Sequence, residues 1–132
     1  MIPPMAAGIE VPSLTDGVAD RAAEGGSGVM HAVIGIWTVD PAWHDEQHRL
    51  LREEIIPLVR RQPGFLTGYW MHDPESGRSH TTAVFHDLES AGRFKALVES
   101  GTRQAARVGV VSAVLTTVDV VAHAEHPDSP PR

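Results

Sequence analysis

Two histidines four residues apart, His44 and His48, are the side chains whose type and spacing best suit chemistry. Residues four apart share one face of an α-helix, so the two imidazoles would project together, with Gln47 beside them. A neutral imidazole can accept a proton near neutral pH, which makes histidine a common general base. We therefore predict His44 and His48 as catalytic residues and Gln47 as a lining residue of the same ligand pocket.

Two other interpretations of this pair stay open. Histidines at i and i+4 can chelate zinc, although the segment His44-Asp-Glu-Gln-His48 displaces the glutamate of the zincin motif. A catalytic zinc site usually needs a third protein ligand, and none is evident in the sequence, so we predict no metal. The remaining interpretation is a partly solvated pair near the end of the helix that has no chemical role.

The tryptophans Trp37 and Trp70 are predicted either to fill the core or to form walls of the same pocket. A buried indole N–H needs a hydrogen-bond acceptor, so one of them could be aimed at a ligand. Leu51 and His80 complete the predicted pocket. An alternative for His80 is a cross-strand pair with His72, because the two histidines flank a predicted hairpin loop.

Composition limits the class of protein. The chain has 132 residues, a formal net charge of −6, no cysteine and no asparagine. The absence of cysteine rules out a disulfide framework and a thiolate metal site, and the acidic balance argues against a nucleic-acid partner. No apolar run approaches the roughly 18 residues of a membrane span, and the first ten residues do not resemble a signal peptide. We expect a cytoplasmic protein with no nucleic-acid or membrane partner.

The chain divides into one domain and two tails. All seven aromatic residues lie between Trp37 and Phe94, whereas residues 1–29 hold eight of the 22 glycines and prolines. We predict disordered tails at residues 1–29 and 125–132, with a short helix possible at Leu14–Glu24, around a domain at residues 30–124.

Periodicity within the domain predicts its secondary structure. Strands are expected at residues 30–39, 65–72, 78–85 and 110–124, and helices at 41–61 and 88–100, with a further turn or two at 102–108. Asp40 and Asp87 are the predicted N-caps, and Pro57 should kink the first helix. The order β-α-β-β-α-β predicts an α+β, ferredoxin-like fold with both helices on one face of a four-stranded antiparallel sheet.

The first and last predicted strands carry apolar residues on both faces. Two helices can cover only one face of the sheet, so a single copy would expose a large apolar surface. We predict a C2 homodimer in which two such sheets pack through their open faces as a dimeric α+β barrel.

Residues Trp43–Phe94 carry a resemblance to a known family. The turn Gln62-Pro-Gly-Phe65 and the strand-to-helix junction Phe85-x-Asp-x-Glu-x-Ala91 are its most specific parts. On these segments, residues 30–124 resemble the antibiotic biosynthesis monooxygenase-like (ABM) family of dimeric α+β barrels. That family includes cofactor-independent quinol and polyketide oxygenases, haem-degrading enzymes and members with no assigned activity.

The missing asparagine narrows what the resemblance implies. The haem-degrading branch uses an Asn–Trp–His constellation with a histidine in the second helix, and residues 88–99 contain no histidine. We therefore predict no haem and no other cofactor. One hypothesis is a cofactor-independent monooxygenase that oxidises a small aromatic or quinol-type substrate between helices and sheet, with His44 or His48 as base and Trp37 and Trp70 as walls. The other is a non-catalytic dimeric barrel that binds a small hydrophobic ligand or has an accessory role.

Overall fold

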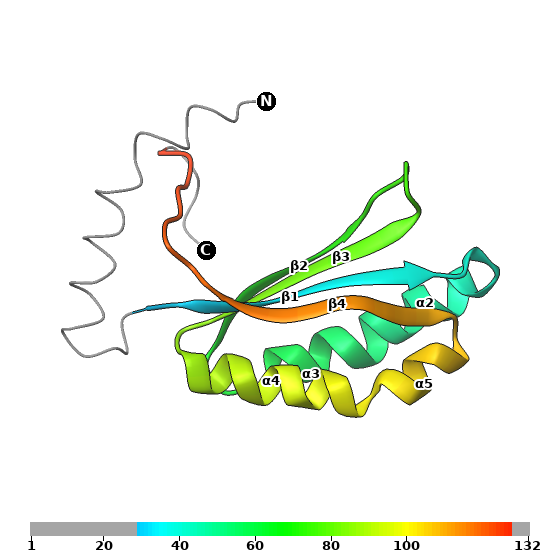
Figure 1. The fold of residues 1–132 in the computed structure, drawn as a ribbon, viewed down its shortest axis with the longest axis horizontal. Helices are drawn as coiled ribbons and strands as arrows, with labels where there is room; N and C mark the ends of the chain where they lie inside the picture. Colours follow the sequence, from blue (N-terminus) through cyan, green and yellow to red (C-terminus); the bar gives the residue numbers. More distant parts are fainter. Residues whose placement is uncertain (1–28, 128–132) are drawn as a thin grey trace.

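A computed structural model describes residues 29–127, so the helix expected at Leu14–Glu24 and residues 1–28 and 128–132 of the predicted tails lie outside the described residues. The four strands β1 (His31–Val39), β2 (Phe65–His72), β3 (Arg78–Phe85) and β4 (Val110–Asp119) form one antiparallel sheet in the order β2-β3-β1-β4. All the helices lie on one side of this sheet (Figure 1). The predicted α+β, ferredoxin-like order is therefore confirmed.

The first helical region is divided into four segments where the sequence predicts one helix. They are η1 (Pro41–Trp43), α2 (His44–Leu50), η2 (Leu51–Ile55) and α3 (Ile56–Arg60). In η2, a π-helical turn, the backbone N–H of Ile56 donates to the carbonyl of Leu51, five residues earlier. Pro57 explains the wider turn, since its ring would collide with the carbonyl four residues before it in a regular α-helix.

The second helical region follows the predicted bounds. Helix α4 (Leu88–Ser100) begins after Asp87, whose carboxylate accepts a hydrogen bond from the Ser90 backbone N–H at 2.8 Å. This bond is the main reason that the pKa of Asp87 lies below its ordinary value. Helix α5 (Thr102–Arg107) is the further helical turn that the sequence predicts.

Strand β4 ends at Asp119 and not at residue 124 as predicted. Its neighbour β1 begins at His31, which pairs with Asp119, and the last ladder-like bond runs from Val120 N–H to the Met30 carbonyl. The apolar residues after Val120 match a strand pattern, but β1 offers them no further partner.

The core lies between the sheet and the helices. Its buried members are three sheet residues and three helix residues: Val33, Ala83, Phe85, Val59, Ala91 and Phe94. Phe85 is completely buried, and its ring centroid lies 5.3 Å from that of Phe94 and 5.7 Å from that of Phe65. We call the side of the sheet that carries Val33, Ala83 and Phe85 the helix-facing side, and the opposite side the open face.

The open face is uncovered and apolar in this single copy. Its side chains include Tyr69, Met71, Val114 and Val118, which are between 38% and 54% exposed. Ile34 and Ile36 lie beside them, because side chains alternate along β1 and the register aligns these residues across the sheet. None of the helices between residues 29 and 127 has the length and apolar character of a membrane span.

Candidate functional site

Both predicted catalytic histidines are exposed side chains of α2. The centroids of the His44 and His48 rings lie 4.2 Å apart, with 34° between the ring planes. Within residues 29–127, neither ring makes a hydrogen bond or an ion pair. Helix α2 contributes no buried residue, and Trp43, just before it, is 44% exposed, so the first half of this helical region is not seated in the core. The imidazole nitrogens are therefore free to meet a ligand or exchange protons.

The histidines line a hollow of about 550 Å³ in the surface of α2 and η2. The lining is formed by six side chains: His44, Asp45, His48, Arg49, Arg52 and Glu53. None of the other predicted pocket residues lines it: Trp37, Gln47, Leu51, Trp70 and His80. Among the described residues, no three potential metal ligands lie together. The hollow is thus a polar site lined by one helical segment, and neither Trp37 nor Trp70 contributes to its lining.

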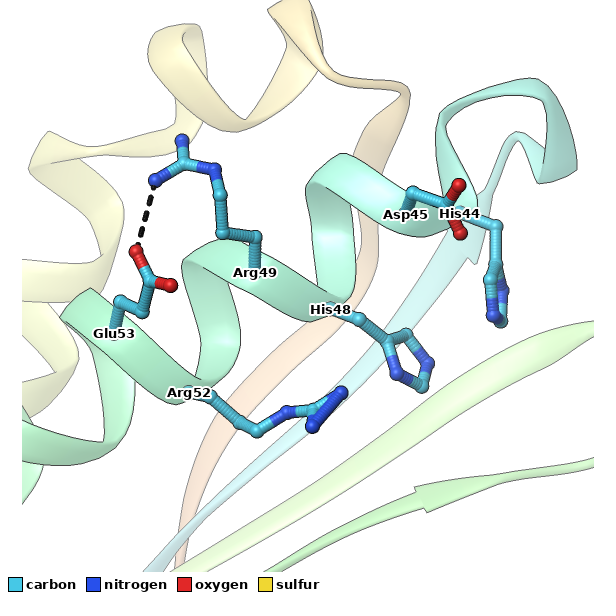
Figure 2. A pocket seen from close by; sticks show the side chains of 6 residues that line it. All are labelled: His44, Asp45, His48, Arg49, Arg52 and Glu53. Atoms are coloured by element: carbon cyan, nitrogen blue, oxygen red, sulfur yellow. Dashed lines mark hydrogen bonds and ion pairs between the residues drawn. The ribbon is translucent and has the colours of Figure 1, made fainter.

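Arg49 organises the acidic residues around this hollow. It donates hydrogen bonds to Glu46 and to Glu53, the latter at 3.2 Å, and its guanidinium lies 4.0 Å from a carboxylate oxygen of Glu54. The hydrogen bond from Arg49 lowers the pKa of Glu46, and the bond to Glu46 raises the pKa of Arg49. Arg52, in contrast, has no hydrogen bond or ion pair with any described residue. Figure 2 shows Arg49 and Glu53 on one side of the helix, and His48 and Arg52 on another.

Gln47 has a structural role in this arrangement. Its Nε2 donates to the backbone carbonyls of Asp40 at 2.9 Å and Val108 at 2.8 Å. The backbone N–H of Asp40 donates to the carbonyl of Gly109 at 2.8 Å, next to the same link between α5 and β4. Gln47 therefore ties α2 to this link, and both amide hydrogens are used within the chain. Leu51, also expected in the pocket, is half-buried at the start of η2.

Trp37 and Thr81 form a hydrogen-bonded pair on the helix-facing side. Trp37 Nε1 donates to Thr81 Oγ1 at 3.2 Å, and Thr81 is aligned with Gly35 in β1 and with Trp70 in β2. A Cβ atom on Gly35 would lie 2.6 Å from Trp37 Nε1 and 2.7 Å from Thr81 Oγ1. Glycine at this position therefore lets the indole lie against the strand. Thr81 was not among the predicted site residues, although its alternation with Ala83 places it on the same side of the sheet.

Trp70 lies beside this pair and offers a free donor. Its ring covers Gly68, where a Cβ atom would lie 3.1 Å from Trp70 Cη2. Trp70 Nε1 has no hydrogen-bond partner among residues 29–127, and no buried side-chain polar atom in that range lacks one, so this N–H reaches solvent. Trp37 and Trp70 thus share one side of the sheet, with Trp70 able to donate to a ligand.

His80 lies on the open face, where it is aligned with Ile36 and Met71. It cannot share a pocket with Trp37 and Trp70 within one copy, because they lie on the opposite side of the sheet. The predicted cross-strand pair of His72 and His80 is wrong. The loop between β2 and β3 sets a register in which His72 is aligned with Ser79, so the two histidines project from opposite faces.

Comparison with known proteins gives matches among solved structures. No family model and no curated protein matches the chain. The monooxygenase ActVA-Orf6 of Streptomyces coelicolor, solved with the ligand nanaomycin D, is 14% identical with a TM-score of 0.53, over 78% of this chain and 95% of that one. A candidate antibiotic biosynthesis monooxygenase from Bacteroides thetaiotaomicron is 19% identical with a TM-score of 0.51, over 81% of this chain and 100% of that one. At these identities the likeness establishes the fold and leaves the site to be argued from this chain's own residues.

Proposed function

We propose that this chain, whose fold is the one found in antibiotic biosynthesis monooxygenases, is a homodimeric, cofactor-independent monooxygenase of small aromatic or quinol-type substrates. The substrate would lie between the α2–η2 segment and the helix-facing side of the sheet, with His44 or His48 as the base. The observation that carries this proposal is the pair of unpartnered imidazoles on a helix that contributes nothing to the buried core.

The reaction places a specific demand on the substrate. Without a cofactor, the substrate itself must supply electrons to O₂, and a stabilised carbanion or phenolate can do so. A histidine would accept the proton, the substrate anion would reduce O₂, and a new C–O bond would form. For an anthrone, the balanced reaction converts a CH₂ group into a carbonyl, and the second oxygen atom leaves as water with the two hydrogens removed. For a quinol, a ring C–H becomes C–OH as the quinol is oxidised to a quinone, and the second oxygen atom again leaves as water.

The tryptophans support a binding surface for a flat substrate. Trp37 and Trp70 lie on the same side of the sheet, and glycines beneath them keep the strands accessible to the rings. Because the N–H of Trp37 is bound to Thr81, the free N–H of Trp70 is the indole donor available to a substrate oxygen. Trp70 would then orient the substrate while a histidine removes the proton.

The homodimer is proposed from the open face. A row of half-exposed apolar side chains runs across it, and a second copy of the same sheet would cover that row symmetrically. Sheets that pack face to face lie about 10 Å apart, a distance that side chains such as Tyr69 and Met71 can fill. Size-exclusion chromatography with light scattering should find a dimer, and a stable monomer at low micromolar concentration would contradict this part of the proposal.

A second candidate function is a non-catalytic barrel that binds a hydrophobic ligand or serves as an accessory subunit. The exposure of His44 and His48 favours this second function, because neighbouring protein groups do little to activate a catalytic base that is surrounded by water. The donors of Gln47 and Trp37 are also already used within the chain.

Oxygen uptake separates the two functions. The purified full chain, treated with a chelator, would be incubated with anthrones and quinols in an oxygen electrode. The monooxygenase proposal expects uptake above the buffer rate, which falls at least about 100-fold in the double variant His44→Ala/His48→Ala. His123→Ala, an exposed histidine away from the hollow, is the matched control. Saturable quenching of tryptophan fluorescence without oxygen uptake would support the second function, and neither response would contradict both.

A further inference from the structure

We propose that His44, His48 and Arg52 form an anion-binding row that holds an oxyanion, a carboxylate or a phosphate, of the protein's aromatic ligand. That the ligand is aromatic rests on the proposed function, whereas the binding of an oxyanion by this row does not depend on any catalysis.

The three side chains project into the same space. They stand at positions i, i+4 and i+8 of the α2–η2 segment, and all three line the hollow of about 550 Å³. Figure 2 shows them on one side of the helical segment, away from the Arg49–Glu53 pair. The volume lies within the range of small-molecule sites, and the polar lining suits the charged group of a ligand.

The ion pairs around the hollow separate its charges. Arg49 pairs with Glu46 and Glu53, so these two carboxylates are held by Arg49 and neither pairs with Arg52. Arg52 keeps an unpaired guanidinium, whose planar fork of N–H donors matches carboxylate and phosphate oxygens. The remaining lining acid, Asp45, lies next to His44 in the first turn of α2, where the helix dipole favours a negative charge. An oxyanion is therefore best held between His48 and Arg52.

The imidazoles suit the same ligand. Their ring nitrogens have no partner among residues 29–127, so each ring can donate an N–H to an oxyanion. Two rings with centroids 4.2 Å apart repel each other when both are protonated, and a bound anion offsets that repulsion. A histidine pair alone could also take a transition-metal cation, but the unpaired Arg52 in the same row favours an anion.

Calorimetric titration of the full chain with four probes tests the proposal. The probes are benzoate, phenyl phosphate, the neutral isostere benzamide, and inorganic phosphate. We expect benzoate or phenyl phosphate to bind at least about fivefold more tightly than benzamide, and added salt to weaken this binding. The tighter of the two anions identifies the group as carboxylate or phosphate, and inorganic phosphate shows whether the anion binds without the ring.

Variants assign the binding to the row. Arg52→Gln should weaken anion binding about fivefold, as expected for one exposed charge pair, and His48→Gln should also weaken it. Arg103→Gln removes the same charge from an exposed arginine of α5 and should leave the affinity unchanged. Circular dichroism spectra of all variants would verify that they fold.

Several results would overturn the proposal. They are binding of both benzoate and phenyl phosphate no tighter than that of benzamide, an Arg52→Gln variant that binds these anions like the wild type, or Zn²⁺ binding that depends on His44 and His48 without any anion binding. Anion binding without oxygen uptake would contradict the monooxygenase proposal alone. Oxygen uptake from neutral substrates that is unchanged in Arg52→Gln, with no anion binding, would contradict the anion-binding row alone.

Discussion

Gln47 holds the start of α2 against the rest of the domain, and its removal should destabilise the fold measurably. Gln47→Ala removes two hydrogen bonds, to the Asp40 carbonyl at 2.9 Å and to the half-buried Val108 carbonyl at 2.8 Å. A hydrogen bond contributes about 0.5–1.5 kcal/mol net, and the exposed bond to Asp40 should lie at the lower end of that range. The expected loss is therefore about 1–2 kcal/mol, which corresponds to a decrease in Tm of roughly 4–16 °C for a domain of this size.

Thermal and urea unfolding followed by circular dichroism would measure this loss. Gln104→Ala, at an exposed position of α5, is the matched control and should leave the stability nearly unchanged. Gln47→Glu keeps the length of the side chain but faces two carbonyls with an acceptor, so it should destabilise at least as much as alanine. A Gln47→Ala variant with unchanged stability and weakened ligand binding would refute the structural role and return Gln47 to the pocket.

Three further predictions concern the sheet and the helix cap. Gly35→Ala places a Cβ atom 2.6 Å from Trp37 Nε1, so it should lower the free energy of unfolding by about 1–3 kcal/mol and shift the tryptophan fluorescence emission. An unchanged emission spectrum and unchanged stability would count against the Trp37–Thr81 pair. The ionised carboxylate of Asp87, whose pKa is lowered in the fold, stabilises the fold fully at pH values above the ordinary aspartate pKa. This stabilisation is lost as the pH falls through the lowered pKa of Asp87. Urea midpoints between about pH 6 and pH 3 should therefore fall less steeply in Asp87→Asn than in the wild type, and identical slopes would contradict the cap. Val114→Lys puts a charge on the open face and should convert a wild-type dimer into a monomer by light scattering, whereas an unchanged dimer would place the interface elsewhere.

Most of the fold follows from local patterns in the sequence. The alternation in β1 correctly separates Val33 and Trp37 from Ile34 and Ile36, and the caps at Asp40 and Asp87 mark where the helical regions begin. The end of β4 could not be found in this way, because it depends on where its partner β1 begins. The π-helical turn before Pro57 is a local adjustment that a regular 3.6-residue period does not describe.

The site was predictable where it depends on one helix and not where it depends on packing. The spacing of His44 and His48 predicts neighbouring rings, and they are neighbours in the structure. Their exposure agrees with the partly solvated pair that the sequence left open as one interpretation. The sequence could not decide between that interpretation and a pocket, because the spacing of apolar residues on a helix does not show which edge of the apolar face meets the sheet. The contact of Gln47 with Val108 joins residues 61 apart in sequence, so it requires the tertiary structure. The same helical spacing also predicts that Arg52 lies beside His48, because it follows four residues later.

Oxygen-isotope labelling tests the proposed activity most directly. The chelator-treated full chain would react with an anthrone or quinol under ¹⁸O₂, and mass spectrometry would follow the oxygen in the product and in water. The proposal predicts one labelled oxygen atom in the product and the other in water, at a rate that the His44→Ala/His48→Ala variant loses. Product without label, or labelled product formed at the same rate by that variant and by buffer, would contradict it.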